Sequence, residues 1–319
     1  MGEYYLGIDL GGTKIAGLLG DEQGKIIAEK TIPTLAEEGV EPVISRIKNI
    51  IREMMGEVPS EQVKGIGLCV PGPLNIKTGE VMYAPNLRWK NVRIAGILEK
   101  EFGLPVILEN DANAAGYGEC IYGAGKGAVN MLYMTVSTGI GGGIIANGEL
   151  VYGRDYCAGE VGHMIVLPGG PLCGCGQHGC IEALASGTAI ARAARKRLGE
   201  GKQSIIPDLV NGDINAVTSR EVAEAARQGD QLAVSLLDEA FSYLGIAIGN
   251  LINLLNPETI VIGGGVAKMG DLLFDRVGRV LQDHAFPHMV TGVSIVPAVL
   301  EGRAGTMGMV ALVQKKLNS

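Results

Sequence analysis

A glycine loop between two apolar strands occurs twice in this chain, and this repeat limits the possible folds more than any other feature. The first copy passes from an expected strand at 4–8 into the loop Asp9–Lys14, and the second from an expected strand at 131–136 into the loop Ser137–Gly143. Another strand and a turn follow each loop, and the later turn is Asn147-Gly148, a common two-residue hairpin sequence. Two copies in the same order predict a duplicated fold with a nucleotide between two lobes.

Strands and helices alternate along the rest of the chain, which is typical of α/β proteins. We expect further strands at 15–19, 25–33, 63–70, 106–109 and 259–262 and from Ile144, and helices at 42–55, 92–102, 231–255 and 305–316 and from Ala112 and Thr218. A chain of 319 residues is too long for one ordinary core. We therefore predict a small lobe of residues 1–109, joined by a closing helix at 303–319, and a large lobe of residues 110–302.

The first glycine loop has the composition of a phosphate-binding turn. Gly11 and Gly12 allow successive main-chain N–H groups to face an anion, and Thr13 adds a hydroxyl donor. Asp9 is acidic beside this site, which requires a divalent cation such as Mg²⁺ between it and the phosphates. A plain hairpin turn is the alternative for this segment taken alone.

The second loop, Ser137–Gly143, matches neither of the two common nucleotide-binding motifs. A Rossmann motif that began at Gly139 would need glycine at the position of Ile144, and it would open a helix and not a strand. A Walker A loop would end in Gly-Lys-Ser/Thr, which the sequence lacks here. A flexible loop is the alternative, but the likeness of the two loops favours phosphate binding by both, with Thr138 and Gly139 among the contacts.

A third glycine turn, made of Gly263, Gly264 and Gly265, follows an expected strand and precedes a helical pattern. Such a turn allows an adenine or ribose to lie against the backbone. Tight packing between the strand and the helix explains the same glycines, so this segment alone does not decide between the two.

Three cysteines lie within eight residues, at Cys173, Cys175 and Cys180, and His163 precedes them by ten. Three thiolates and one imidazole are the donor set of a tetrahedral zinc site. Four protein ligands leave no open position, so the zinc would be structural. Reduced buried cysteines or a disulfide are the alternatives. His178 is the rival fourth ligand, and a poorer one because it lies inside the tight loop between two of the cysteines.

The cysteine usage and the absence of a basic leader before the first strand indicate a reducing compartment, so we expect a cytoplasmic protein. The net charge of −7 disfavours nucleic acid as a partner, whereas backbone N–H groups can bind ATP on an acidic protein. The longest uncharged stretch, Ala240–Pro257, contains three asparagines, and we interpret it as a buried or interface helix and not as a membrane span.

Asn110 and Asp111 end an expected strand, which is where α/β sheets place their sites. An aspartate there can take the proton of a sugar hydroxyl as the oxygen attacks phosphorus. Capping of the following helix by the asparagine is the alternative.

These segments together resemble the ROK family of bacterial sugar kinases and related repressors, over nearly the whole chain. The motifs that carry the resemblance are the two phosphate loops, Glu109–Asn113, the signature Glu160-x-Gly-His163 with Cys-x-Cys-Gly-x-x-Gly-Cys-x-Glu ending at Glu182, and Ile262–Gly265. The resemblance implies an actin-like ATPase (ribonuclease H-like) fold with a nucleotide cleft between its lobes.

The resemblance also implies a role for each site residue. Asp111 would be the general base, and His163 would bind zinc through one ring nitrogen and the sugar through the other. The sugar would contact Gly72, Asn110, Glu160, His163 and Glu182. ATP with Mg²⁺ would contact Asp9, Gly11, Gly12, Thr13, Lys14, Thr138, Gly139, Gly263, Gly264 and Gly265.

The family contains kinases and repressors, and the repressors carry a helix-turn-helix before the kinase-like core. The first strand here begins by Tyr4 and the Asp9 loop is intact, so we expect a kinase. The cysteine run is similar to that of glucokinases, which makes the 6-hydroxyl of glucose the expected acceptor. Fructokinases, N-acetylmannosamine kinases and N-acetylglucosamine kinases share most of the motifs, and polyphosphate is an alternative donor. We expect a homodimer or homotetramer, with the helix at 231–255 as a contact surface.

Overall fold

The computed structural model describes residues 2–318, and its contacts divide the chain into two compact units. Unit one consists of the segment up to Val129, residues 143–159 and the segment from Val299, and unit two of residues 130–142 and 160–298. The closing helix belongs to unit one. The lobe boundary near Glu109 stays a prediction.

Unit one contains most strands of the N-terminal half. Its strands and helices are β1 (Tyr4–Leu10), β2 (Lys14–Asp21), β3 (Ile26–Pro33), α1 (Val40–Met55), β4 (Val63–Val70), β5 (Leu74–Asn75), β6 (Glu80–Ala84), β7 (Trp89–Val92), α2 (Ile94–Phe102), β8 (Val106–Asn110), α3 (Asp111–Tyr122), β11 (Glu149–Leu150) and α10 (Ala304–Asn318). The strand β10 (Ile140–Ala146) begins in unit two and ends in unit one.

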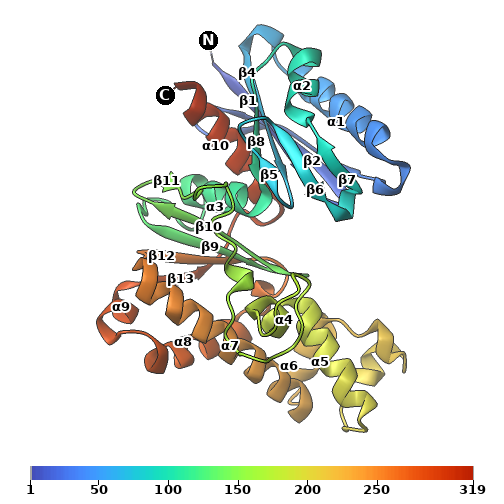
Figure 1. Cartoon of the computed structure of the whole chain (residues 1–319), viewed down its shortest axis with the longest axis vertical. Coiled ribbons are helices and arrows are strands. Elements are labelled where there is room, and N and C mark those ends of the chain that lie inside the picture. The colour runs from blue at the N-terminus through green and yellow to red at the C-terminus, as the bar shows by residue number, and fades with distance from the viewer. Residues whose placement is uncertain (1, 319) are drawn as a thin grey trace. The chain divides into compact units, whose positions relative to one another are not determined.

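Unit two is mostly helical. Its strands and helices are β9 (Met131–Val136), α4 (Ile181–Ala185), α5 (Gly187–Gly199), α6 (Ser219–Arg227), α7 (Gln231–Leu255), β12 (Thr259–Gly263), α8 (Asp271–His284), α9 (Pro287–Gly292) and β13 (Ser294–Pro297) (Figure 1).

The two large sheets have the same strand order. One runs β3-β2-β1-β4-β8 and the other β11-β10-β9-β12-β13, so in each case three consecutive strands in reverse order are followed by two later ones. In the first sheet β1 pairs antiparallel with β2 and parallel with β4, and in the second β9 pairs parallel with β12. The duplication predicted from the glycine loops is therefore confirmed in the topology of the sheets.

Most predicted elements are confirmed, and local signals explain their ends. The hairpin at Asn147 and Gly148 has φ values of 54° and 76°, as a turn with two left-handed residues requires. The helix α7 starts after Asp230, whose side chain accepts a hydrogen bond from the Ala233 N–H, and it ends at left-handed Asn256. Among the described residues α7 alone is long and apolar enough to cross a membrane, but more than half of its most apolar stretch is buried in the protein.

One predicted boundary is wrong. We expected the second glycine loop to extend to Gly143, but β10 already begins at Ile140. The loop is closed early because the Ser137 N–H donates to the Gly139 carbonyl at 2.8 Å. The later glycines lie within the strand, where a Cβ atom on Gly143 would lie 3.0 Å from the Ala112 carbonyl oxygen. Gly143 therefore serves close packing and not loop formation.

Helices cover both faces of the sheet of unit one. Apolar side chains of α1 and α2 pack with one face of the sheet in the main core, and α10 covers the other face through Met307, Val310 and Val313. The backbone of α10 comes unusually close to its neighbours, because a Cβ atom on Gly308 would lie 1.7 Å from the Ala114 carbonyl oxygen of α3.

Replacing Gly308 by alanine should destabilise the protein by about 3 kcal/mol or more, because two helix backbones must move apart to admit one methyl group. Gly278 is the matched control, since it also lies in a helix but a Cβ atom there has no neighbour within 4 Å. Gly278→Ala should stabilise by about 0.5–1 kcal/mol. Urea unfolding of both variants measures the difference, and equal stabilities would contradict this account of α10.

Candidate functional site

The first glycine loop is a rigid turn in unit one. The Gly11 N–H donates to the Lys14 carbonyl at 2.9 Å, and the Thr34 hydroxyl donates to the Gly11 carbonyl at 2.7 Å. A Cβ atom on Gly12 would lie 2.9 Å from the Asn86 side chain, so the second glycine is required by packing. These contacts within the protein fix the shape of the loop, as an anion-binding turn needs.

Three polar residues stand in one row at the carboxyl ends of β1, β4 and β8. The strand register pairs Asp9 with Cys69 and Cys69 with Glu109. Burial raises the pKa of the Asp9 carboxyl, while Lys14 and a hydrogen bond from the Cys69 thiol act against that rise. Burial and the carboxylates of Asp9, Asp111 and Glu109 raise the pKa of Cys69 far above its usual range. The thiol therefore stays protonated and donates to Asp9.

Asn110 and Asp111 lie at the junction of β8 and α3. The Asn110 side chain accepts hydrogen bonds from the Ala112 N–H at 2.9 Å and the Asn113 N–H at 3.2 Å, so it caps the helix as one of the two alternatives predicted. Capping uses only the side-chain oxygen, which leaves the amide nitrogen to donate to a ligand. Asp111 is the first residue of α3 and is half-buried.

Gly72 has a structural reason to be glycine. Its φ is 103°, and a Cβ atom there would lie 2.4 Å from the Tyr83 carbonyl oxygen. The backbone of the β4–β5 connection can approach β6 this closely only without a side chain.

In unit two, Glu182 joins the second glycine loop to the cysteine cluster. One of its carboxylate oxygens accepts a hydrogen bond from the Ile140 N–H at 2.9 Å, and the other lies 3.7 Å from the Cys173 sulfur. A Cβ atom on Gly139 would lie 2.4 Å from the same carboxylate, so this glycine makes room for Glu182. Glu182 is thus held in place by two of the predicted motifs.

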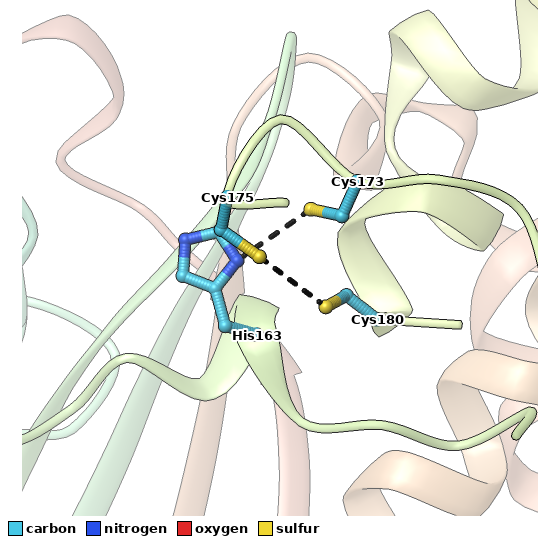
Figure 2. Close-up of side chains that lie close together, drawn as sticks. All are labelled: His163, Cys173, Cys175 and Cys180. Atoms are coloured by element: carbon cyan, nitrogen blue, oxygen red, sulfur yellow. Dashed lines mark hydrogen bonds between the residues drawn. The ribbon is translucent and has the colours of Figure 1, made fainter. Parts of the chain in front are cut away.

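The three cysteine sulfurs and the His163 imidazole point toward one another (Figure 2). The His163 Nδ1 atom lies 3.7 Å from the Cys173 sulfur, the Cys175 and Cys180 sulfurs lie 3.6 Å apart, and the four ligand atoms are all within 4.8 Å of one another. Zinc–sulfur bonds of about 2.3 Å place tetrahedral ligands about 3.7 Å apart. The donor set and its spacing therefore fit zinc.

The two rivals for the fourth ligand separate clearly. The His178 Nδ1 atom lies 3.0 Å from the Gly170 carbonyl oxygen, and its side chain is exposed and outside the cluster. His163 turns Nδ1 toward the sulfurs, while its Nε2 atom lies 3.9 Å from a Glu160 carboxylate oxygen. One imidazole therefore faces the cysteines with one nitrogen and the Glu160 carboxylate with the other.

A cavity of about 680 Å³ lies in unit two beside the second glycine loop. Its walls include Thr138 and Gly265 together with the first residues of α5 and α6. Two helix N-termini at one cavity favour a bound anion. The capping box of Thr218 and Glu221, predicted from the sequence, holds the start of α6 in place.

The three glycines at 263–265 differ in their surroundings. A Cβ atom would lie 2.6 Å from the Tyr133 hydroxyl at Gly263 and 2.4 Å from the Val136 carbonyl oxygen at Gly264, so strand packing explains both. Gly265 lines the cavity, and a Cβ atom there would have its nearest neighbour at 3.8 Å. Strand packing therefore accounts for Gly263 and Gly264, and the adenosine contact stays a prediction that Gly265 leaves room for.

Sequence reasoning missed several residues that line the cavity. All of them lie on helices or turns that carry no sequence motif. They are Gly187, Thr188, Ala191, Arg195, Arg220, Arg227 and Lys268. The Arg195 guanidinium donates to the Val217 carbonyl at 2.9 Å and 3.2 Å, which fixes it at the cavity wall. The one available signal was Ser186 before a helical pattern, since its side chain caps α5.

Comparison with known proteins identifies the group to which this architecture belongs. The ROK family profile matches residues 5–316. The chain belongs to the ROK family. The glucokinase of Halalkalibacterium halodurans is 40% identical over 319 residues, which cover 99% of this chain and 96% of that protein. A ROK family glucokinase from Streptomyces griseus, solved in complex with glucose and AMPPNP, has a TM-score of 0.82 and 34% identity, covering 98% of this chain and 99% of that one.

ROK repressors match as well. The xylose repressor of Caldicellulosiruptor bescii is 30% identical over 310 residues, which cover 97% of this chain and 77% of the repressor. The predicted family and the predicted actin-like duplicated fold are confirmed by these full-length matches.

Replacing Cys175 by serine should remove most of the bound zinc and lower the melting temperature, because metal binding in a closed site couples to folding. Cys157→Ser is the matched control, since Cys157 is also exposed but lies outside the cluster. Metal analysis of freshly purified protein should find about one zinc per chain in the parent and in the control. A parent protein without zinc would contradict the assignment.

Proposed function

We propose that this ROK protein is an ATP-dependent hexokinase that transfers the γ-phosphoryl group of ATP to the 6-hydroxyl of glucose. The observation that supports this most directly is the full-length likeness to a glucokinase solved with glucose and AMPPNP. The sites described above supply what the reaction needs, because phosphoryl transfer depends on positioning and charge neutralisation more than on covalent chemistry.

ATP is proposed to bind in the cavity of unit two. Its adenosine would lie against Gly265, and its phosphates would face the loop at Thr138 and the N-termini of α5 and α6. The first loop would bind phosphate through its N–H groups, and Asp9 would hold Mg²⁺ through water, which neutralises phosphate charge.

The sugar is proposed to bind to the Asn110 amide, the Glu160 and Glu182 carboxylates and the His163 Nε2 atom, beside Gly72. The three cysteines and His163 Nδ1 would hold zinc, whose contribution is to fix the loop and the imidazole tautomer. Since Glu182 contacts both Cys173 and Ile140, the same loop would also fix a second sugar ligand.

Asp111 is proposed as the general base. Its carboxylate would take the proton of the 6-hydroxyl as that oxygen forms its bond to phosphorus and ADP leaves. Asp111 is the first residue of α3, directly after the Asn110 proposed to bind the sugar, which supports this role. The cytoplasmic location and the homodimer or homotetramer stay predictions.

Replacing Asp111 by alanine should lower kcat by about two to four orders of magnitude, the range for a lost general base, while glucose binding stays measurable. Asp271→Ala is the matched control, because Asp271 is the first residue of α8 as Asp111 is of α3. Coupled ADP-release assays give kcat, and calorimetry gives the glucose affinity. An unchanged kcat would refute the role of Asp111.

A panel of single hexoses in the same assay tests the acceptor. Glucose should give the highest kcat/KM, ahead of mannose, fructose, N-acetylmannosamine and N-acetylglucosamine. A higher value for another sugar would replace glucose as the substrate, and no turnover of any sugar with ATP or polyphosphate would favour a repressor.

Gly265→Leu should raise the KM for ATP by about tenfold or more and leave the KM for glucose unchanged, because the new side chain would occupy the cavity while its Cβ atom meets only ordinary contacts. Steady-state kinetics with each substrate varied in turn separate the two constants. A KM for ATP like that of the parent would place the adenosine elsewhere.

A further inference from the structure

Glu109 is a buried carboxylate at the end of β8 whose oxygens accept hydrogen bonds from three neutral donors. It is 1% exposed. One oxygen accepts hydrogen bonds from the Asn110 N–H at 2.9 Å and the Asn113 side-chain amide at 3.1 Å, and the other accepts one from the Tyr152 hydroxyl at 2.9 Å. Because a buried carboxylate is costly unless its oxygens are hydrogen-bonded, these donors must keep their places.

Two of these donors belong to the start of α3. The Asn110 N–H and the Asn113 amide lie on either side of Asp111 in the sequence, and Asn110 also caps the helix. Glu109 therefore fixes the backbone from which the Asn110 and Asp111 side chains project. Its own side chain is committed to these bonds and is not directed to a ligand.

The third donor, Tyr152, comes from a segment distant in sequence, residues 151–159, which follows β11. Tyr152 stacks edge-to-face with Tyr156 at 5.8 Å between ring centres, and the Lys316 ammonium lies 6.0 Å from its ring. Burial and the Glu109 carboxylate raise the pKa of Tyr152, so its hydroxyl remains a donor across the physiological pH range. The ring contacts hold this donor in a fixed direction.

We propose that Glu109 and Tyr152 form a positioning pair that sets Asn110 and Asp111 for phosphoryl transfer. The pair rests on the proposed function, since it acts through the proposed base and not on the substrates. Removing the tyrosine hydroxyl would leave one oxygen of a buried carboxylate without its donor. The carboxylate would then shift toward its remaining partners and move the start of α3, and small displacements of a catalytic group cost large factors in rate.

The test uses Tyr152→Phe, Glu109→Gln and the double variant in the full-length protein. Each single variant should lower kcat on the order of tenfold with the KM for ATP unchanged. The double variant should be no more than about twofold below Glu109→Gln, because the two changes remove one shared bond. Amide hydrogen exchange at Asn110 and Asn113 should be faster in Tyr152→Phe than in the parent.

Tyr117→Phe is the matched control. Tyr117 is buried in unit one, six residues after Asp111 in α3, and the Lys315 ammonium lies 5.4 Å from its ring centre. It should leave kcat and exchange at Asn110 unchanged even if it lowers the melting temperature.

The outcomes separate the pair from the proposed function. A parent protein without sugar kinase activity would overturn the proposed function. The hydrogen exchange rate at Asn110 in Tyr152→Phe would then test whether Glu109 and Tyr152 position the start of α3. An active parent with kcat unchanged in Tyr152→Phe would overturn the pair and leave the proposed function standing. Unchanged exchange at Asn110 in Tyr152→Phe, or multiplicative losses in the double variant, would also overturn the pair.

Discussion

The sheet of unit one depends on the close backbone packing of α10 against β1 and α3. Cβ atoms on Gly7 and Gly308 would lie 2.0 Å and 1.7 Å from carbonyl oxygens of neighbouring segments, so the helix can lie there only because these positions are glycine. A Cβ atom on Gly305 would lie 3.0 Å from the Asp9 carboxylate and 3.2 Å from the Cys69 sulfur, so the same helix closes over the polar row of the sheet. The glycines at these positions thus act by letting elements approach.

Each unit carries polar groups that a buried neighbour holds in place. In unit one the strand register aligns Asp9, Cys69 and Glu109, and the following helix presents Asp111. In unit two the spacing of the cysteines turns His163 so that its second nitrogen faces Glu160. In both cases a residue with no proposed role in the reaction fixes the orientation of a residue that has one. A site positioned in this way keeps its geometry before the substrate binds.

The sequence could predict the features that depend on local signals. The two strand–loop–strand copies, the helix ends at Thr218 and Asn256 and the cysteine cluster depend on residues close together in the chain. The predicted start of the strand β10 was wrong because a glycine that serves close packing looks the same in sequence as a glycine that forms a loop. The cavity wall at Arg195 and the bond from Tyr152 to Glu109 were missed because they join segments that meet only in the folded protein.

The place of α10 has a consequence for how the chain is made. The fifteen residues of this helix cover strands that are synthesised some three hundred positions earlier. The apolar face formed by Tyr5 and Leu18 therefore has no native cover until α10 has been made, whereas unit two is complete once Ala298 has been added. During synthesis the half of the protein that begins first is finished last, and its exposed face is the surface a chaperone would need to shield.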